Sequence, residues 1–315
     1  MSEPAGPQVG TSVDEALAVL RRGGLVAIPT ETVYGLAADA SNPAAVRRIF
    51  VAKGRPADHP LIVHVGRPEQ LAAWAATVPP AAGVLADACW PGPLTLLVPR
   101  AAHVLDVVTG GRDTVGIRVP AHPLTEDLLL RFGGGLAAPS ANRFGQVSPT
   151  TAAHVVADLG DAVDYVLDGG ACPVGVESTI VDCSVEPPQI LRPGGIPTEQ
   201  IDALLGGALA PASGPSRAAG MLAAHYAPRA RVLLAASAQE AAALATEVGP
   251  TAWVLDRTGD LVAYARHLYA DLRGADERGV VTVVAVLPLA EGLGHAIRDR
   301  LAKAAASSTP GSAFT

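Results

Sequence analysis

Short apolar runs alternate along the first two hundred residues with segments in which apolar residues recur at helical spacing. The strand-like runs lie at 25–28, 61–65, 94–98, 115–119, 165–167 and 179–181. The helical patterns lie at 12–22, 43–52, 69–77, 80–88, 123–131 and 149–159. Because the two kinds alternate imperfectly, the pattern favours a mixed, twisted sheet with flanking helices over a purely parallel one. The predicted class is α/β, with the strand order left open.

Two of these helices carry recognisable start signals. Ser12, followed three residues later by Glu15, forms a capping-box pattern ahead of the first apolar series. Ser148 stands as a cap before Pro149, which suits the first position of the helix at 149–159. We therefore expect helices to begin next to Ser12 and Ser148.

The pattern breaks after residue 205 and then resumes. Residues 206–220 are rich in Gly, Ala, Pro and Ser without hydrophobic periodicity, as in a linker. Strand-like runs follow at 232–234, 252–255 and 280–286, and helical patterns at 237–248, 260–273 and 290–306. This alternation predicts a small Rossmann-like parallel α/β domain. We expect a first domain at 1–205, a linker at 206–229 and a C-terminal domain at 230–315.

Composition narrows the function classes. The 315 residues are 49% hydrophobic, enough for two buried cores, and carry a net charge of -7. An acidic chain without a basic cluster makes nucleic-acid binding the minor hypothesis. Gly, Pro or charge interrupts every apolar run before bilayer length, and the first ten residues do not resemble a secretory signal. We expect a cytoplasmic, nucleotide-using enzyme with no membrane span, whose three cysteines are buried thiols.

Familiar nucleotide motifs are absent from the sequence. The stretch from Gly170 to Gly175 resembles a P-loop, but Val176 and Glu177 stand where Lys and Ser or Thr are needed. Neither a GxGxxG after a strand nor a GxSxG around Ser140 occurs. The P-loop, dinucleotide-binding and α/β-hydrolase classes are therefore excluded.

Polar residues instead gather in turns that follow the predicted strands. These clusters lie at 29–36, 53–56, 138–142 with 148–150, and 175–179 with 192–195. Each cluster alone could serve only to form a turn, and Lys53 and Arg55 could simply interact with the dipole at a helix end. Together they supply hydroxyls, amides and cations without paired carboxylates or a metal-ligand set. This combination suits electrostatic stabilisation of phosphoryl chemistry.

At these residues the sequence resembles the YrdC/Sua5 family, the L-threonylcarbamoyladenylate synthases, over roughly residues 13–200. The motifs that carry the resemblance are Thr30–Leu36 (TETVYGL), Lys53–Pro56 (KGRP), Pro60–His64 (PLIVH), Trp90–Thr95 (WPGPLT), Arg118–Pro120 (RVP), Pro139–Asn142 (PSAN), Ser148–Thr151 (SPTT) and Leu191–Gly194 (LRPG). His225–Pro228 (HYAP) and Arg300–Ala305 (RLAKAA) resemble the linker end and C-terminal domain of the long Sua5 type. Ala219–Met221 (AGM) departs from the usual Pro-Gly-Met of that linker.

The resemblance implies a nucleotidyltransferase that joins L-threonine, bicarbonate or CO2, and ATP into threonylcarbamoyl-AMP and pyrophosphate. The product would serve t6A37 modification of tRNA. Mg²⁺ would arrive through the ATP phosphates, so no protein metal site is expected. Partners would be the tRNA threonylcarbamoyl-transfer machinery, with weak or no direct tRNA binding. The alternatives are a carbamoyl-transfer domain that uses carbamoyl phosphate and an RNA-binding translation module.

The resemblance also implies roles for individual residues. Catalytic roles fall on Lys53, Arg55, Ser140 and Asn142. ATP contacts fall on Arg55, His59, Thr114, Asn142, Ser148, Arg192 and Tyr226. Threonine contacts fall on Thr32, His64, Arg118, Ser140 and Ser178. We expect the linker at 206–228 to order as a lid over both substrates, with Tyr226 touching the nucleotide.

Overall fold

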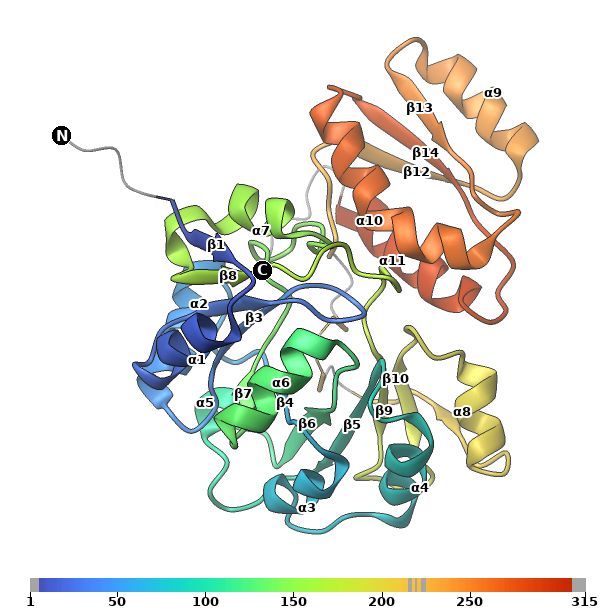
Figure 1. The fold of residues 1–315 in the computed structure, drawn as a ribbon. Helices are drawn as coiled ribbons and strands as arrows, with labels where there is room; N and C mark the ends of the chain where they lie inside the picture. The colour runs from blue at the N-terminus through green and yellow to red at the C-terminus, as the bar shows by residue number, and fades with distance from the viewer. Residues whose placement is uncertain (1–5, 215–216, 219, 222–224, 308–315) are drawn as a thin grey trace, which may run out of the picture.

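The computed structural model describes residues 6–214, 217–218, 220–221 and 225–307. Its strands in the first two thirds of the chain are β1 (Gln8–Gly10), β2 (Val26–Ile28), β3 (Gly35–Asp39), β4 (Ile62–His64), β5 (Leu94–Pro99), β6 (Thr114–Arg118), β7 (Leu136–Ala137), β8 (Tyr165–Leu167), β9 (Thr179–Asp182), β10 (Gln189–Arg192) and β11 (Ala210–Pro211). They form one 11-stranded mixed sheet in the order β1-β8-β2-β3-β7-β4-β6-β5-β9-β10-β11 (Figure 1). The mixed, twisted α/β sheet predicted from the sequence is thereby confirmed.

The helices of this first part are α1 (Val13–Arg21), α2 (Pro43–Lys53), α3 (Leu71–Trp74), α4 (Pro80–Cys89), α5 (Asp106–Thr109), α6 (Pro123–Phe132), α7 (Ala152–Leu159) and α8 (Thr198–Leu204). They cover both faces of the sheet because its strands are apolar on both sides. In β2, Val26 and Ile28 join the core under α1 and α6, whereas Ala27 joins the core that holds α2 and α4.

The remainder of the described chain is a second, smaller α/β unit. Its elements are β12 (Arg231–Ala235), α9 (Ala238–Val248), β13 (Ala252–Leu255), α10 (Leu261–Glu277), β14 (Thr282–Val286) and α11 (Gly294–Ser307). The three strands are parallel in the order β12-β14-β13, as the sequence pattern predicted. We call residues 231–307 the C-terminal part; α10 and α11 lie on its side nearer the large sheet (Figure 1).

One helix start predicted from the sequence is wrong. The helix expected at 149–159 begins at Ala152, and its cap is Thr151, whose side chain accepts from the backbone N–H of His154. Ser148 instead donates its hydroxyl hydrogen to Glu177 at 2.6 Å, and the carbonyl of Pro149 accepts from Tyr34. These tertiary contacts hold 147–150 outside the helix. At α1 the predicted Ser12 cap is present, accepting from Glu15 N at 3.2 Å.

Part of the linker packs on the large sheet. Ala210 and Pro211 form β11, a parallel edge strand beside β10 that the sequence pattern did not indicate. Ala218 and Met221 pack in one apolar cluster with Leu97 and Ile180 of the sheet. Ala219, Ala223 and Ala224 of the linker lie outside the described residues. The described linker therefore follows the sheet and does not hang free as a plain spacer would.

All three cysteines, Cys89, Cys172 and Cys183, are buried and unpaired, as expected. Within the described ranges, no helix combines the length and the apolar character needed to cross a bilayer.

Candidate active site

Parallel pairing of β4 and β6 sets the floor of the candidate site. Ile62 lies beside Gly116 and His64 beside Arg118, so these residues share one face of the sheet. Thr114 lies on that same face of β6, four residues or about 13 Å from Arg118. Gly116 lies between them, and a Cβ there would already contact neighbouring side chains at 3.3–3.6 Å. We call the part of this face around His64 and Arg118 the inner end of the site.

A cavity lies over this face and is bounded by strand ends and loops from nine separate segments of the chain. Its lining residues are Thr30, Val33, Gly35, Arg55, Ile62, His64, Arg118, Ala138, Pro139, Ser140, Glu177, Ser178, Arg192, Gly220, His225 and Tyr226. The free volume is about 50 Å³, enough for a few water molecules. Pockets that hold drug-sized ligands measure about 300–1,000 Å³. The site is thus closed in this arrangement.

At the inner end of the site, Arg118 is almost fully buried. Its Nη2 pairs with Glu31 Oε1 at 2.9 Å and donates to Thr32 Oγ1 at 2.9 Å, whereas its Nε has no partner within the described chain. Burial, followed by the Arg118 charge, lowers the pKa of His64 to about 3. This end therefore presents a neutral imidazole beside a buried cation.

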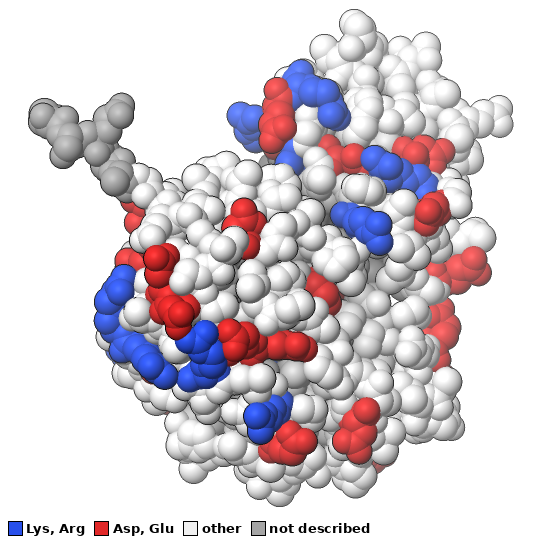
Figure 2. Space-filling model, in the orientation of Figure 1, with Lys and Arg blue, Asp and Glu red and all other residues white. Residues whose placement is uncertain are grey.

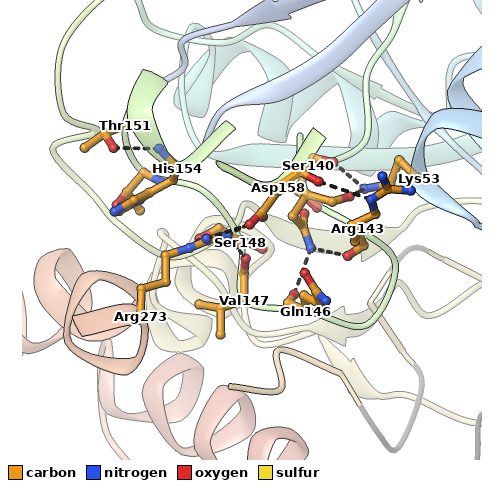
Figure 3. A network of polar contacts seen from close by, with 12 residues as sticks. Lys53, Ser140, Arg143, Gln146, Val147, Ser148, Thr151, His154, Asp158 and Arg273 are labelled. Atoms are coloured by element: carbon orange, nitrogen blue, oxygen red, sulfur yellow. Dashed lines mark hydrogen bonds and ion pairs between the residues drawn. The ribbon is translucent and has the colours of Figure 1, made fainter. Parts of the chain in front are cut away.

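Lys53 ends α2 and organises the Ser-x-Asn turn. Its ammonium group donates to the carbonyl of Ser140 at 2.5 Å and to that of Asn142 at 2.6 Å (Figure 3). Burial, followed by the neighbouring Arg55 charge, lowers the pKa of Lys53 well below its usual range. Lys53 thus lies behind the turn and outside the lining of the cavity, while Ser140 is part of that lining.

The Asn142 side chain is buried inside the same turn. Its amide nitrogen donates to the carbonyls of Arg143 and Gln146, both at 2.8 Å. Its Oδ1 has no hydrogen-bond partner among the described residues. A buried acceptor without a partner is costly in a native fold, so it indicates a place where a ligand donor fits.

Arg55 lies at the outer end of the cavity. Its Nη2 donates to the carbonyl of Pro60 at 3.1 Å, its guanidinium lies 5.7 Å from the Phe144 ring, and its Nε has no partner within the described chain. Burial lowers the pKa of Arg55 to about 10, which still leaves it charged at neutral pH. His59 contacts the same Phe144 ring edge-on. This end carries a fixed positive charge next to an aromatic surface.

Two loops that lie side by side carry Ser178 and Arg192. Arg192 Nη2 donates to the carbonyl of Ser178 at 2.8 Å and to its hydroxyl at 3.2 Å. The Ser178 hydroxyl also shares a hydrogen with Thr95 Oγ1 at 2.8 Å. A Cβ on Gly194 would lie 2.3 Å from the backbone of Ser178 and Thr179, so only glycine allows these loops to approach.

Glu177 is the carboxylate of the cavity wall. One oxygen accepts from Ser148, and the other accepts from Tyr269 and Arg300 of the C-terminal part, each at 2.7 Å. Burial alone would raise its pKa, but the charges of Arg300 and Arg192 outweigh burial and lower it to about 2. Glu177 is therefore ionised, and hydrogen bonds hold it in place.

The described end of the linker closes the cavity. Tyr226 adopts the left-handed backbone conformation with φ 62°, which is uncommon for a bulky side chain. Its ring is buried, stacks on Tyr269 and has a hydroxyl without a partner within the described chain. His225 packs against Tyr226 with the ring centroids 4.1 Å apart. These two side chains occupy space above the sheet and explain the small free volume.

Seven of the residues expected in the site line one cavity. They are Arg55, His64, Arg118, Ser140, Ser178, Arg192 and Tyr226. Thr32, Lys53, Asn142 and Ser148 lie directly behind that lining, each bonded to a lining residue or its turn. His59 and Thr114 lie outside it, and His59 contacts the same Phe144 ring as Arg55. The prediction gave no site role to Glu31, Glu177 or His225.

Only part of these omissions could have been avoided. Glu31 and Glu177 stand inside the polar clusters, where an acidic residue among hydroxyls was the available signal. Arg300 lies more than a hundred residues away on α11, and no local pattern connects it with Glu177.

The fold and the site together define a class of protein. The Sua5/YciO/YrdC family model, described as "Telomere recombination", matches residues 18–194, and a model of the threonylcarbamoyl-AMP synthase C-terminal domain matches 196–306. The chain belongs to the Sua5/YrdC family.

Its relatives include long proteins with both parts. It is 41% identical to the threonylcarbamoyl-AMP synthase of Pyrococcus abyssi, over 92% of each chain, and 39% identical to that of Bacillus subtilis, over 93% of this chain and 92% of the relative. The crystal structure of P. abyssi Sua5 complexed with L-threonine superposes with a TM-score of 0.88 at 40% identity, covering 94% of both chains.

The face of the molecule drawn in Figure 2 carries both positive and negative side chains. Figure 2 shows Lys and Arg beside Asp and Glu over most of the visible face, with wide uncharged areas between them. Among the surface ion pairs of the protein, Arg131 pairs with Asp14 and Asp127. The described residues of this face therefore form no continuous basic surface of the kind that nucleic-acid phosphates require.

Proposed function

We propose that this protein is a threonylcarbamoyl-AMP synthase, which joins L-threonine, bicarbonate or CO2, and ATP into threonylcarbamoyl-AMP and releases pyrophosphate. The observation that carries the proposal is one cavity in which buried cations, hydroxyls and a neutral imidazole converge, in a chain whose full-length relatives carry that activity. The product would be consumed by a transfer of the threonylcarbamoyl group to tRNA.

Threonine fits the inner end of the site. The free Nε of Arg118 is a donor for the amino-acid carboxylate, and the Ser178 hydroxyl is a second polar contact. If His64 donates from Nδ1 to the Ile62 carbonyl, 3.3 Å away, its Nε2 is an acceptor for the threonine amine or hydroxyl. Thr32 holds the Arg118 guanidinium in the orientation that this role needs.

ATP fits the outer end. Arg55, with its free Nε and fixed charge, would neutralise phosphate oxygens, and Asn142 Oδ1 would accept from a nucleotide donor. The attacking carbamate and the leaving pyrophosphate are both anionic, so positioning and charge neutralisation would dominate catalysis. Ser140, between the two ends, would contact the reacting groups, and Lys53 would hold the turn that positions it.

Further ATP contacts would come from Arg192, Ser148 and Tyr226 around the cavity, and from His59 and Thr114 at its outer edge. Mg²⁺ would enter with the substrate, bound by phosphate oxygens and water. The described residues contain no group of three or more His, Cys, Asp or Glu side chains placed to hold a metal ion. Glu177, the carboxylate of the wall, already accepts three hydrogen bonds.

ATP is too large for the closed cavity, so His225 and Tyr226 must move for the nucleotide to bind. We infer that the linker, residues 206–229, opens and closes the site between a catalytic domain at 1–205 and a C-terminal domain at 230–315. Two contacts hold described residues of this segment in the closed arrangement: Arg217 Nε pairs with Asp182 at 2.6 Å, and Lys303 donates to the carbonyl of Gly220 at 2.6 Å.

The test is pyrophosphate release from ATP with both L-threonine and bicarbonate, with each alone and with neither. We expect release to require both substrates and the adenylate product to be detected by mass spectrometry. ATP cleavage that is independent of both would refute the synthase. If carbamoyl phosphate replaced threonine and bicarbonate, the activity would be carbamoyl transfer.

A further inference from the structure

Arg300 on α11 joins the two loops that carry Ser178 and Arg192. The side chain is fully buried. Its Nε donates to Glu177, the residue before Ser178, at 2.7 Å, and its Nη1 donates to the carbonyl of Pro193, the residue after Arg192, at 2.9 Å. One guanidinium from the C-terminal part therefore fixes the spacing of two loops in the cavity wall.

One face of α10 holds the same region from the side. Arg266, Tyr269 and Arg273 are spaced by three and four residues, which places them in line along one face of the helix. Arg266 donates to the carbonyl of Pro173 at 2.9 Å, and Tyr269 donates to Glu177 at 2.7 Å. Two contacts from this helix therefore hold the region next to the site, and Arg273 adds a third.

Arg273 completes this row of contacts. It donates to the carbonyl of Val147 and pairs with Asp158 on α7 (Figure 3). Val147 precedes Ser148, whose hydroxyl donates to Glu177. The loop at 147–148 is thus held by the same helix that holds Glu177.

The loop that carries Glu177 also packs directly against the backbone of α10. Gly175 has φ +81°, and a Cβ there would lie 2.5 Å from the carbonyl oxygen of Ala265 and the Cα of Arg266. The loop at 173–178 thus lies directly on the backbone of α10, which leaves it little freedom to shift independently of the C-terminal part.

We propose that Arg300 and Tyr269 are positioning residues, through which the C-terminal part sets the geometry of the substrate site by holding Glu177. The proposal rests on the proposed function for the identity of the substrates. An ionised carboxylate buried in the cavity wall needs its cation and donors to keep one position. Its backbone continues directly into Ser178, and misplacing a reacting group by about 1 Å can lower the rate about 10²-fold.

The test compares variants of the full-length chain. Tyr269→Phe removes one hydroxyl and retains the ring, Arg300→Lys keeps the charge but cannot bond both Glu177 and Pro193, and Arg300→Met removes the charge. Arg298→Met is the matched control, because Arg298 lies on the same helix and donates to the carbonyl of Pro288 within the C-terminal part. KM for threonine, KM for ATP and kcat are measured separately, and calorimetry measures the binding of each substrate.

We expect threonine KM to rise about 3- to 10-fold in Tyr269→Phe and kcat/KM to fall about 10²-fold in Arg300→Lys, with thermal unfolding close to that of the unmodified chain. The Arg298→Met control should retain both constants. Arg300→Met removes one of the two cations that stabilise ionised Glu177, so this variant is also combined with Glu177→Gln, which removes the carboxylate charge. Because Arg300 acts through Glu177, the double variant Arg300→Met/Glu177→Gln should be at least as active as the less active of the two single variants.

Two results would overturn the proposal. One is threonine and ATP constants within twofold of the unmodified values in both Tyr269→Phe and Arg300→Lys. The other is a double variant whose loss equals the product of the two single losses, since Arg300 and Glu177 would then act independently. If the unmodified chain releases no threonine-dependent pyrophosphate, the proposed function fails. The calorimetric affinities for threonine and ATP still test the positioning role in that case. Unchanged affinities in the variants would reject it, and a tenfold loss of affinity would support it.

Discussion

The ammonium group of Lys53 lies 2.6 Å from the backbone carbonyl oxygen of Asn142, so the end of α2 and the Ser-x-Asn turn form one unit. The same nitrogen also donates to the carbonyl of Ser140. Lys53 and Arg55 are only two residues apart, yet the first supports a turn and the second lines the cavity. Substitutions of Lys53 and of Arg55 should therefore have different effects on stability and turnover.

We predict that Lys53→Met lowers both stability and turnover, whereas Arg55→Met lowers mainly turnover. Without Lys53, two buried carbonyls lose their donor, at about 1–3 kcal/mol each, and the turn that carries Ser140 shifts. Without Arg55, a positioned charge is lost, which typically lowers kcat about 10²-fold or more. Urea unfolding and pyrophosphate release measure the two effects, with Arg47→Ala, exposed on the same helix, as control. Near-normal turnover in both folded variants would show that Lys53 and Arg55 have no catalytic role and only mark the end of α2.

Arg118→Ala and Ser178→Ala should weaken threonine more than ATP. Both residues line the cavity, where Arg118 offers a donor to a carboxylate and Ser178 a neutral hydrogen bond. Separate calorimetric titrations with threonine and with ATP measure the difference. Arg100→Ala is the control, because Arg100 pairs with Asp106 outside the cavity. An equal loss for both ligands would place threonine elsewhere.

The same pocket should prefer threonine over serine by a finite factor. Serine lacks one methyl group, and a small apolar subpocket discriminates such a loss by about 1–3 kcal/mol. The ratio of kcat/KM for the two amino acids measures this preference directly. Identical kinetics with serine would contradict a pocket that contacts the threonine methyl.

Gly175→Ala should destabilise the chain more than Gly133→Ala. Both glycines have φ +81°, so alanine carries the same backbone strain at either position, about 1–2 kcal/mol. The added Cβ meets nothing within 4 Å at Gly133 but meets the α10 backbone at 2.5 Å at Gly175. Overpacking adds about 1–3 kcal/mol at Gly175. Thermal unfolding of both variants is the measurement, and equal losses would mean that the contact with α10 is loose.

Stability should fall as the pH is lowered from 6.5 toward 3. Burial lowers the pKa of both His64 and His225 from 6.5 to about 3 in the folded chain. The unfolded chain therefore binds more protons in this range, and each histidine should remove about 2 kcal/mol of stability by pH 5. Above pH 6.5 both forms are neutral and the effect vanishes. Urea unfolding at pH 7 and pH 5 tests this.

In the same experiment His225→Phe should show a smaller pH dependence, because one of the two buried imidazoles is gone. His267→Gln, exposed on α10, is the control and should leave the dependence unchanged. A His225→Phe variant as sensitive to pH as the original chain would show that His225 accepts a proton without unfolding.

The sequence alone determined the elements whose signals are local. Ser12 caps α1 because its hydroxyl reaches a backbone N–H three residues away, and Gly54 ends α2 in the left-handed conformation that glycine adopts readily. The alternating C-terminal pattern likewise predicted three parallel strands, since each strand and helix there has its own periodicity. The polar clusters marked the candidate site because they form short, contiguous motifs.

Tertiary structure decided what depends on contacts between distant residues. Ser148 resembled a helix cap, but its hydroxyl bonds Glu177, 29 residues away, so the helix starts later. The short strands β3 and β7 exist because neighbouring strands pair with them. The sequence could not reveal that Arg300 bonds Glu177, 123 residues away. A buried ion pair of this kind forms when two distant parts of the chain pack together, and neither part carries a local sequence pattern that indicates it.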